Sequence, residues 1–562
     1  DMLERFGRMR DLEGLPRLEM GSPAEFFDAA MAEYPDAPVW FGELYFEMHR
    51  GTYTSQARTK QGNRRCEALL REAELWSVAA FGGREADGYP AAALDRIWKD
   101  VLLHQFHDIL PGSSIGWVHR EAEIAYAQVA DELVEIIDAA LERLAGDREA
   151  LANPAPADHD GVVVLDATTM GADPAAQVLS DGRVAVDVAV PAGGVVVAEP
   201  RELGDRSPVT VSDGDDGADV VIDNGLIRVV VDAAGHIRSL VDLVRGREAI
   251  APGGRANRLQ LHQDLPNEYD AWDIEEFYRH RVTYLDEVDA VEVLDDGPLV
   301  ARVSVRRSFR SSAITQVIEV RAGSPRVDVV CDVEWAEHEQ LLKVAFPLDV
   351  HSTEMTREIQ FGHLRTAFHT NTSWDAARFE VCAHKWADLS EGDYGVSLLN
   401  DCKYGYDIHD NVMRLTLLKS AVSPDPEADQ GAHTFRYSLL PHAGDWRGAT
   451  VAEGYALNVE PVVWAGQGAA AAAATVSLVA VDRPGVVIET VKAAEDGRGI
   501  IVRLYESHRG RGEVTLTTAL PLAAAERTNL VEESEGALPV EGNTVRFPIQ
   551  PYEIVTLRLL PA

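Results

Sequence analysis

Residues 102–114 have the sequence LLHQFHDILPGSS, which predicts the end of an amphipathic helix. His104, His107 and Asp108 lie at positions i, i+3 and i+4, so this helix predicts that they share one face. Pro111 and Gly112 then predict the helix end. Upstream, apolar side chains recur at spacings of three and four residues, the pattern of one buried face: Leu94, Ile97, Trp98, Val101, Leu102 and Phe106.

An imidazole beside a carboxylate at a helix end is compatible with two roles. It can present a metal ligand or hold a substrate, or it can be a structural pair that only satisfies hydrogen bonds. The segments 40–56 and 60–65 favour the first role. They offer carboxylates, arginines, tyrosines, threonines and a tryptophan, with little apolar periodicity between them. Such side chains stack on sugar rings and bind sugar hydroxyls.

Together with residues 105–114, these segments resemble glycoside hydrolase family 38, the retaining α-mannosidases. Further matching motifs follow in order along nearly the whole chain: DAWDI (270–274), LLKVAFP (341–347), NTSWD (371–375), WADLSE (386–391), KYGYD (403–407) and DPEADQG (425–431).

The resemblance implies a catalytic α/β barrel, a three-helix bundle and then large β-sandwich domains. The barrel of this family carries a His-x-Asp metal motif, a nucleophilic Asp and an acid/base Asp, and no stretch of this sequence matches them. A retaining glycosidase needs both carboxyl groups, about 5–5.5 Å apart. We therefore expect the chain to be the C-terminal portion of an α-mannosidase, with no catalytic residue of its own and no activity alone.

The resemblance also implies residue roles. The family binds a divalent cation, usually zinc, and His107 matches one of its ligands, so we expect zinc or another divalent cation with one ligand from this chain. Asp108 matches the neighbouring carboxylate, which supports the site or holds a sugar hydroxyl. His104 is not required by the family and is interpreted as a helix-surface residue or as one that supports a ligand without binding the metal.

Two polar and aromatic segments are expected to contact α-mannoside glycans. The alternative for both is packing at a domain junction. The predicted substrate-binding residues are Asp108, Tyr45, Glu47, His49, Arg50, Tyr53, Asp264, Asp270, Trp272 and Asp273. Weaker candidates for the same role are Trp374, Asp375, His384, Trp386, Asp388, Lys403, Tyr404 and Asp429.

Periodicity predicts an α+β multidomain fold. Helical spacing of apolar residues ends near Asn153-Pro154, and short segments with period two follow. We predict the tail of a catalytic α/β-barrel domain (1–56), a three-helix bundle (57–150), a small β region (151–204), a large mutarotase-like antiparallel β-sandwich (205–446) and a C-terminal β-sandwich (447–562).

Composition excludes some partners. The chain has 52 basic and 92 acidic residues among 562, a net charge of −40. This balance argues against nucleic acid and an anionic membrane surface, and no apolar run is long enough to span a bilayer. The four scattered cysteines predict reduced thiols and a cytoplasmic location. Expected partners are α-mannoside glycans and the N-terminal catalytic domain, and assembly into a homo-oligomer is left open.

Two other functions remain open from the sequence. The chain could be a non-catalytic carbohydrate-binding or assembly module. It could also be an independent sandwich enzyme such as a mutarotase, which needs a general acid and base in one cleft. His262, Glu337 and His338 could supply them. The pair His107 and Asp108 discriminates, because a mutarotase has no use for it.

Overall fold

The computed structural model describes residues 1–145, 149–166, 169–214, 217–464 and 477–562. It has two compact units, Asp1–Phe46 and Glu47–Ala562. The first unit contains two helices, α1 (Met2–Met9) and α2 (Pro23–Glu33), and neither helix buries a side chain. The expected correspondence of the first 56 residues to the tail of an α/β barrel stays a prediction, as do the other domain boundaries.

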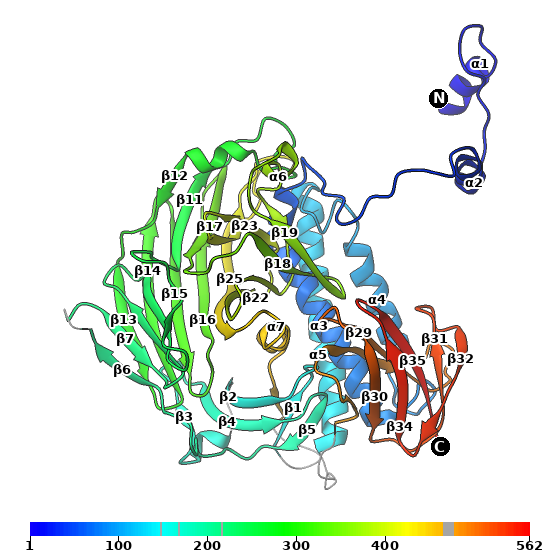
Figure 1. Ribbon diagram of the computed structural model, residues 1–562. Coiled ribbons are helices and arrows are strands. Elements are labelled where there is room, and N and C mark those ends of the chain that lie inside the picture. Colours follow the sequence, from blue (N-terminus) through cyan, green and yellow to red (C-terminus); the bar gives the residue numbers. More distant parts are fainter. Residues whose placement is uncertain (146–148, 167–168, 215–216, 465–476) are drawn as a thin grey trace. The chain divides into compact units, whose positions relative to one another are not determined.

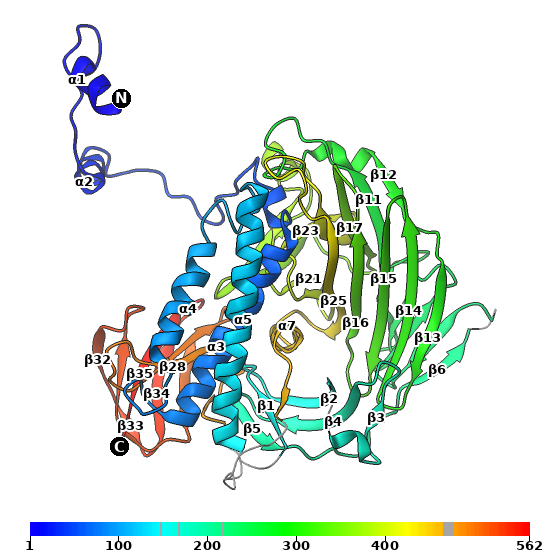
Figure 2. The same ribbon diagram turned by 180° about the vertical axis from the view of Figure 1, so that it is seen from behind.

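The second unit begins with a three-helix bundle, as predicted (Figure 2). Its helices are α3 (Ala57–Phe81), α4 (Ala91–His104) and α5 (Gly116–Ala145). On α5, Ala122, Val129, Leu133 and Ala140 are buried, whereas Ile115 precedes the helix and is 52% exposed. No helix in the described ranges is both long and apolar enough to cross a membrane.

Helix α3 begins at Ala57, directly after Gln56. The backbone N–H groups of Gln56 and Ala57 donate to the carboxylate of Asp429, at 3.0 and 2.7 Å. A carboxylate at a helix N-terminus satisfies orphan N–H groups and complements the helix dipole. The cap comes from a distant part of the sequence, so local periodicity could not reveal it.

The predicted continuation of α4 through Asp108 is wrong. The helix ends at His104, and the amides of Gln105 and Phe106 donate to Leu102 and Leu103, both at 3.2 Å. Such i→i−3 bonds tighten the chain into turns. His104 and the pair His107 and Asp108 therefore do not share one helical face.

Small sheets follow the bundle. Strands β26, β1 and β5 form one three-stranded sheet, and β2, β4 and β3 form another. Their bounds are β1 (Ala150–Asn153), β2 (His159–Leu165), β3 (Gln177–Val178), β4 (Val184–Val190), β5 (Gly194–Val197) and β26 (Val462–Trp464), with a 3₁₀ turn η2 (Thr169–Ala172).

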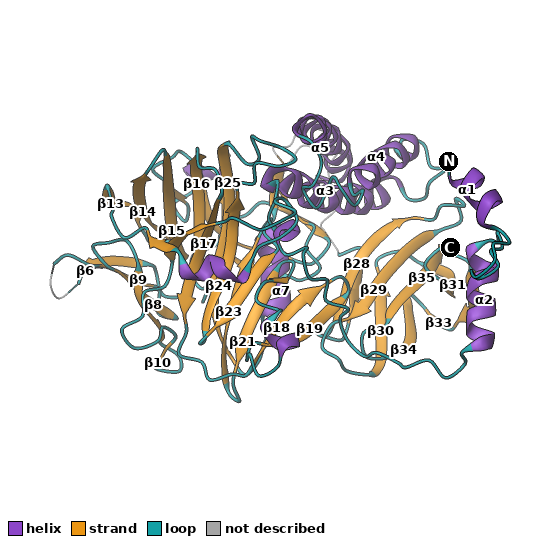
Figure 3. Ribbon diagram, turned by 90° about the horizontal axis from the view of Figure 1, so that it is seen from above, coloured by secondary structure: helices purple, strands orange, loops and turns teal. Residues whose placement is uncertain are grey.

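The large sandwich contains sheets of five, six and nine strands, in the orders β10-β9-β8-β7-β6, β12-β11-β17-β24-β23-β20 and β13-β14-β15-β16-β25-β22-β21-β18-β19 (Figures 1 and 3). The strands pair antiparallel, as expected. Period two is visible in β16, where Cys331, Val333 and Trp335 are buried while Asp332 and Glu334 are exposed.

The strands of the large sandwich are β6 (Thr210–Asp213), β7 (Val220–Asp223), β8 (Ile227–Val231), β9 (Ile237–Asp242), β10 (Arg247–Glu248), β11 (Arg258–Gln263), β12 (Val282–Tyr284), β13 (Ala290–Asp296), β14 (Val300–Phe309), β15 (Ser312–Arg321), β16 (Val327–Trp335), β17 (Gln340–Pro347), β18 (Glu354–Ile359), β19 (Gly362–Ala367), β20 (Val381–Cys382), β21 (Trp386–Ser390), β22 (Tyr394–Asn400), β23 (Gly405–His409), β24 (Val412–Lys419) and β25 (Gly431–Ala443). Short helices η1 (Gly51–Tyr53), η3 (Glu276–His280), α6 (Ser373–Ala376) and α7 (Thr450–Asn458) complete the unit's helical elements in the described ranges.

The C-terminal sandwich has a four-stranded and a five-stranded sheet, ordered β27-β30-β34-β33 and β28-β29-β35-β31-β32. Its apolar side chains form one core with the bundle, and α3 lies against β28. Its strands are β27 (Val479–Val481), β28 (Val486–Ala493), β29 (Ile500–Glu506), β30 (Gly512–Thr518), β31 (Leu522–Thr528), β32 (Ser534–Leu538), β33 (Val540–Glu541), β34 (Thr544–Ile549) and β35 (Ile554–Pro561).

Helix α3 buries a carboxyl group whose ionisation should weaken the fold. Glu72 is 6% exposed and accepts a hydrogen bond from Trp76 Nε1 at 3.0 Å. Burial raises the pKa of Glu72 from 4.5 to about 7. Because the folded-state pKa is the higher one, its contribution to stability is fully present below pH 4.5 and is lost as pH rises toward 7.

Glu72→Gln should therefore remove part of the pH dependence of stability. Relative to the wild type, this variant is expected to gain up to about 3 kcal/mol between pH 5 and 8. Urea unfolding across this range measures the gain. Glu121→Gln is the matched control, because Glu121 also accepts from a tryptophan four residues away, Trp117, but at the surface. An equal gain in both variants would contradict the assignment to burial.

Candidate functional site

The second unit brings four predicted segments together at one end of the bundle. The amides of Gly51 and Thr52 donate to the carbonyl of Trp272, at 2.7 and 3.2 Å. Ser55 Oγ donates to the carbonyl of Ala271 at 2.6 Å. Gln56 Nε2 donates to Asp425 at 2.8 Å, which adds the 425–429 loop that caps α3. Segments far apart in sequence thus build one surface.

Lys60 connects the end of α4 to this surface. It is 4% exposed and donates from Nζ to the carbonyls of Ser55 and Leu110. Burial lowers the pKa of Lys60 to about 7, although Asp429 opposes this shift. The turn formed by residues 110–112 also packs closely against Ser55, since a Cβ on Gly112 would lie 2.4 Å from the carbonyl oxygen of Ser55.

His107 and Asp108 directly precede the segment that Lys60 and Gly112 hold against Ser55. The Nε2 atom of His107 is 3.3 Å from Asp108 Oδ2, and the two side chains are 78% and 41% exposed. Ser113 Oγ donates to Asp108 Oδ1 at 2.9 Å, and Ser114 Oγ donates to the Asp108 carbonyl at 2.7 Å. The carboxylate is therefore held in orientation while the imidazole faces solvent.

His104 has a different environment. Its Nδ1 lies 2.7 Å from the carbonyl of Asp100, and its ring centroid is 5.3 Å from that of Tyr126 in the bundle. Its position outside the metal-ligand set stays a prediction.

Arg50 and Asp273 contact each other. Arg50 is 6% exposed, and its Nη1 lies 3.2 Å from Asp273 Oδ1. The same guanidinium donates to the carbonyl of Ala377 and lies 4.4 Å from the ring centroid of Phe379. This pair fastens the start of the bundle to the large sandwich, so a substrate role for either residue stays a prediction.

Asp264 and Asp270 also have protein partners. Asp264 is 1% exposed and forms an ion pair with Lys419, itself fully buried. Asp270 Oδ2 accepts from the amides of Val422 and Ser423 at 2.7 and 3.0 Å. Both carboxylates hold loops in place in the described structure, and their expected contact with substrate is untested.

The other predicted substrate residues are more accessible. Glu47 is exposed, and His49, Tyr53 and Trp272 are half-buried around the same 3₁₀ turn, η1. Tyr45 belongs to the first unit, Asp1–Phe46, and is described only there.

The weaker candidates divide between structural and exposed positions. Asp429 caps α3, Tyr404 OH accepts from Arg64 at 2.9 Å, and the Trp386 ring stacks 5.4 Å from Trp446. Asp388 accepts from Ser397 at 2.8 Å. Lys403 lies over the Phe435 ring, and the His384 ring contacts the Tyr404 ring. Trp374 and Asp375 lie in α6, where Trp374 is 72% exposed.

The residues considered for a mutarotase-like site have separate partners. His262 is buried, with Nδ1 3.3 Å from the carbonyl of Tyr278. Glu337 accepts from Ser312 Oγ at 2.9 Å. His338, next to it, is exposed. These contacts provide no acid–base pair across a shared cleft.

The described residues offer at most part of a metal site. In the part of the chain that is described, no group of three or more His, Cys, Asp or Glu side chains could hold a metal ion. His107 fits the role of a single ligand because its imidazole is exposed and lies beside an oriented carboxylate. A complete site of three or more protein ligands would need further donors.

Sequence reasoning missed the residues that assemble this surface. Lys60, Ser55 and Lys419 act through backbone carbonyls or buried ion pairs, which leave no local pattern. Asp425 and Asp429 were visible only as part of the DPEADQG motif.

Three family models match the chain. They are the alpha mannosidase middle domain (residues 47–144), the glycosyl hydrolases family 38 C-terminal domain (222–427) and the family 38 C-terminal beta sandwich domain (485–557). The crystal structure of an alpha-mannosidase from Enterococcus faecalis V583 has the same fold, with a TM-score of 0.75 at 15% identity over 95% of this chain and 72% of that one.

Curated relatives match over the full chain. Alpha-mannosidase 2C1 of Homo sapiens is 36% identical over 573 residues, which cover 100% of this chain and 54% of the relative. Alpha-mannosidase of Saccharomyces cerevisiae is 31% identical over 612 residues, covering 100% and 53%. The chain spans about half the length of these relatives and aligns with the C-terminal part of the human protein. The chain therefore belongs to glycosyl hydrolase family 38, of which it carries the middle and C-terminal domains.

Proposed function

We propose that the chain is part of a retaining, divalent-metal-dependent α-mannosidase that hydrolyses terminal α-mannosides of glycans. The observation that carries this proposal is the exposed pair His107 and Asp108, held by buried contacts at the bundle end where the predicted segments converge. Homology to α-mannosidases over the whole chain supports the same reaction class.

In this proposal His107 contributes one ligand to zinc or another divalent cation. When bound, the cation would act as a Lewis acid that positions sugar hydroxyls. Asp108 would orient the imidazole or accept a hydroxyl, and Ser113 holds its carboxylate ready for this. The nucleophile and the acid/base carboxyl would come from an N-terminal catalytic domain, so the chain alone should be inactive.

The surface around His107 suits a domain partner. Apolar side chains near it in the sequence are largely exposed, at 65% for Leu103 and 52% for Phe106. A cluster of exposed large apolar side chains commonly marks an interaction site. We propose that the catalytic domain covers it.

The four free cysteines support a reducing compartment, and hence a cytoplasmic location, as part of the same proposal.

The test uses an N-terminally extended protein that approaches the relatives in length, alongside this chain. We expect hydrolysis of an aryl α-mannoside only by the extended protein, and loss on treatment with a chelator. His107→Ala should lower metal content, measured by elemental analysis, and reduce kcat/KM at least a hundredfold. His104→Ala is the matched control and should keep both. Turnover by this chain alone, or full metal content in His107→Ala, would overturn the assignment.

A further inference from the structure

Helix α3 holds both ends of the turn formed by residues 105–110, called here the His107 turn. At its start, Gln105 Nε2 donates to Asn63 Oδ1 at 3.1 Å. At its end, Lys60 Nζ donates to the carbonyl of Leu110 at 2.9 Å. Lys60 and Asn63 are both buried and lie three residues apart on α3, so they share one face of this helix. The turn is therefore fastened to one rigid element.

His107 and Asp108 lie between these two attachments. The amides of Ile109 and Leu110 both donate to the carbonyl of Phe106, at 2.8 and 3.2 Å. The segment is thus closed by its own backbone hydrogen bonds and can move mainly as a unit. The place of the imidazole relative to the bundle then depends on the attachments at the two ends.

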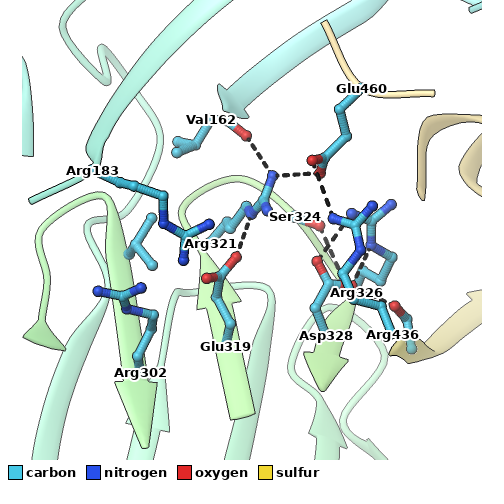
Figure 4. Close-up of polar contacts among 12 residues, drawn as sticks. Val162, Arg183, Arg302, Glu319, Arg321, Ser324, Arg326, Asp328, Arg436 and Glu460 are labelled. Atoms are coloured by element: carbon cyan, nitrogen blue, oxygen red, sulfur yellow. Dashed lines mark hydrogen bonds and ion pairs between the residues drawn. The ribbon is translucent and has the colours of Figure 1, made fainter. Parts of the chain in front are cut away.

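Several buried cations of the second unit have carboxylate partners. Figure 4 shows Arg321, whose Nε lies 2.7 Å from Glu319, and Arg326, whose Nε lies 2.7 Å from Asp328. Such pairing offsets part of the cost of taking a charge out of water. These arginines fix the junction between the large sandwich and its neighbours.

Lys60 is held by carbonyl groups instead. Among the described residues, no carboxylate oxygen lies within 4.0 Å of its Nζ, which donates to the carbonyls of Ser55 and Leu110. Because a carbonyl carries no full charge, it offsets less of the cost of burying an ammonium group than a carboxylate does. The ammonium stands where it joins the start of α3 to the end of the His107 turn.

We propose that Lys60 is a positioning residue for His107. Through the carbonyl of Leu110, its ammonium group fixes the turn that places the imidazole for metal binding. This inference rests on the proposed function, in which His107 contributes one ligand to a divalent cation. Lys60 acts through the backbone of the turn, as the outer partners of metal ligands do in other sites.

The charge of Lys60 should make this positioning depend on pH. Burial lowers the pKa of Lys60 to about 7, against the opposing effects of Asp429 and Cys382 and with a contribution from the cation Lys403. Burial and Lys60 lower the pKa of His119 on α5 to about 4, so this imidazole is neutral near pH 7. Among these groups, Lys60 is therefore the one whose charge changes near neutral pH.

The direction of the pH effect follows from the hydrogen bonds of Lys60. The ammonium should hold the carbonyls more firmly than the neutral amine, because charge-assisted hydrogen bonds are stronger. Its advantage for metal binding is fully present below about pH 7, the pKa in the metal-free chain. The advantage is lost as pH rises through the pKa of Lys60 in the metal-bound protein, which must be higher.

The zinc affinity of the N-terminally extended protein, measured by competition with a chromophoric chelator, tests the proposal. At about pH 6, Lys60→Met should bind zinc at least about tenfold more weakly than the wild type, and at about pH 9 this ratio should shrink. Protonation of His107 affects both proteins alike and cancels in the ratio. Lys492→Met is the matched control and should bind like the wild type, because Lys492 also joins two groups, Glu495 and Glu532, but in the C-terminal sandwich.

Hydrogen exchange of this chain alone provides a readout that needs no metal. Lys60→Met should reduce the protection of the Ile109 and Leu110 amides at least about tenfold. Amides of α5 around Leu133 should keep their protection, which shows that the variant folds. In the wild type, protection of the same two amides should fall as pH rises through about 7, a result that requires no substitution.

The outcomes separate this inference from the proposed function. If the wild-type extended protein binds no zinc, the proposed function fails and the role of Lys60 fails with it. If the wild type binds zinc and Lys60→Met binds it equally well, only the inference is overturned. An equal deficit at both pH values, or an equal deficit in Lys492→Met, would also overturn it, because each indicates a structural effect independent of the Lys60 charge. Unchanged protection of Ile109 and Leu110 in Lys60→Met would contradict the attachment itself.

Discussion

Replacing Lys343 with methionine is expected to lower the free energy of unfolding of the large sandwich by about 3–5 kcal/mol. Lys343 is fully buried on β17, and its Nζ lies 2.5 Å from Glu380 and 2.8 Å from Asp407. Burial alone would lower the pKa of Lys343, but the two carboxylates raise it above its ordinary value, so the ammonium is charged. Methionine keeps most of the volume but removes the charge and the hydrogen bonds from Nζ to Glu380 and Asp407.

The cost comes from the two carboxylates that remain. Arg414 lies 3.0 Å from Asp407, and Thr416 donates to Glu380, yet both acids stay in an interior shielded from water. Removing one partner of a buried charge cluster costs more than the cluster contributes, because the remaining charge stays desolvated. Adding Glu380→Gln to Lys343→Met should therefore recover part of the lost stability.

Hydrogen exchange of the β17 and β24 amides measures this prediction, because a multidomain chain need not unfold in one step. Lys99→Met is the control, since Lys99 pairs with Asp95 at the surface, with its side chain 71% exposed. It should cost less than about 1 kcal/mol. Loss of less than about 1 kcal/mol in Lys343→Met as well would show that the buried cluster is not needed for stability.

Gly112→Ala is expected to cost about 2–5 kcal/mol and to displace the turn that carries His107. Gly112 has φ +89°, where an L residue is strained by roughly 1–2 kcal/mol. The added Cβ would also lie 2.4 Å from the backbone oxygen of Ser55, which has little freedom to move. Overpacking of this kind adds about 1–3 kcal/mol.

Gly82→Ala separates the two contributions. Gly82 follows α3 with φ +90°, and a Cβ there meets nothing within 4 Å. Thermal unfolding should show only the backbone cost in Gly82→Ala and the larger cost in Gly112→Ala. In the extended protein, Gly112→Ala should also lower metal content, whereas Gly82→Ala should not. Equal destabilisation by the two substitutions would argue against close packing of the turn on Ser55.

The sequence by itself determined the element types and the fold class. The spacing of Leu94, Ile97 and Val101 predicted an amphipathic helix, and short segments with period two predicted strands. The ordered motifs predicted family 38, which the family models confirm. These signals come from neighbouring residues or from many motifs in order along the chain. They can therefore be read without knowing any tertiary contact.

Only the tertiary structure decided where helices begin and end and which polar residues meet. Asp429 caps the start of α3, Lys60 ties Leu110 to Ser55, and α4 ends at His104 instead of continuing to Asp108. Likewise Arg50 and Asp273, both predicted to bind substrate, are buried against each other. Bonds between residues hundreds of positions apart leave no periodicity, and a carboxylate has the same letter in the sequence whether it caps a helix, balances a buried cation or faces a sugar.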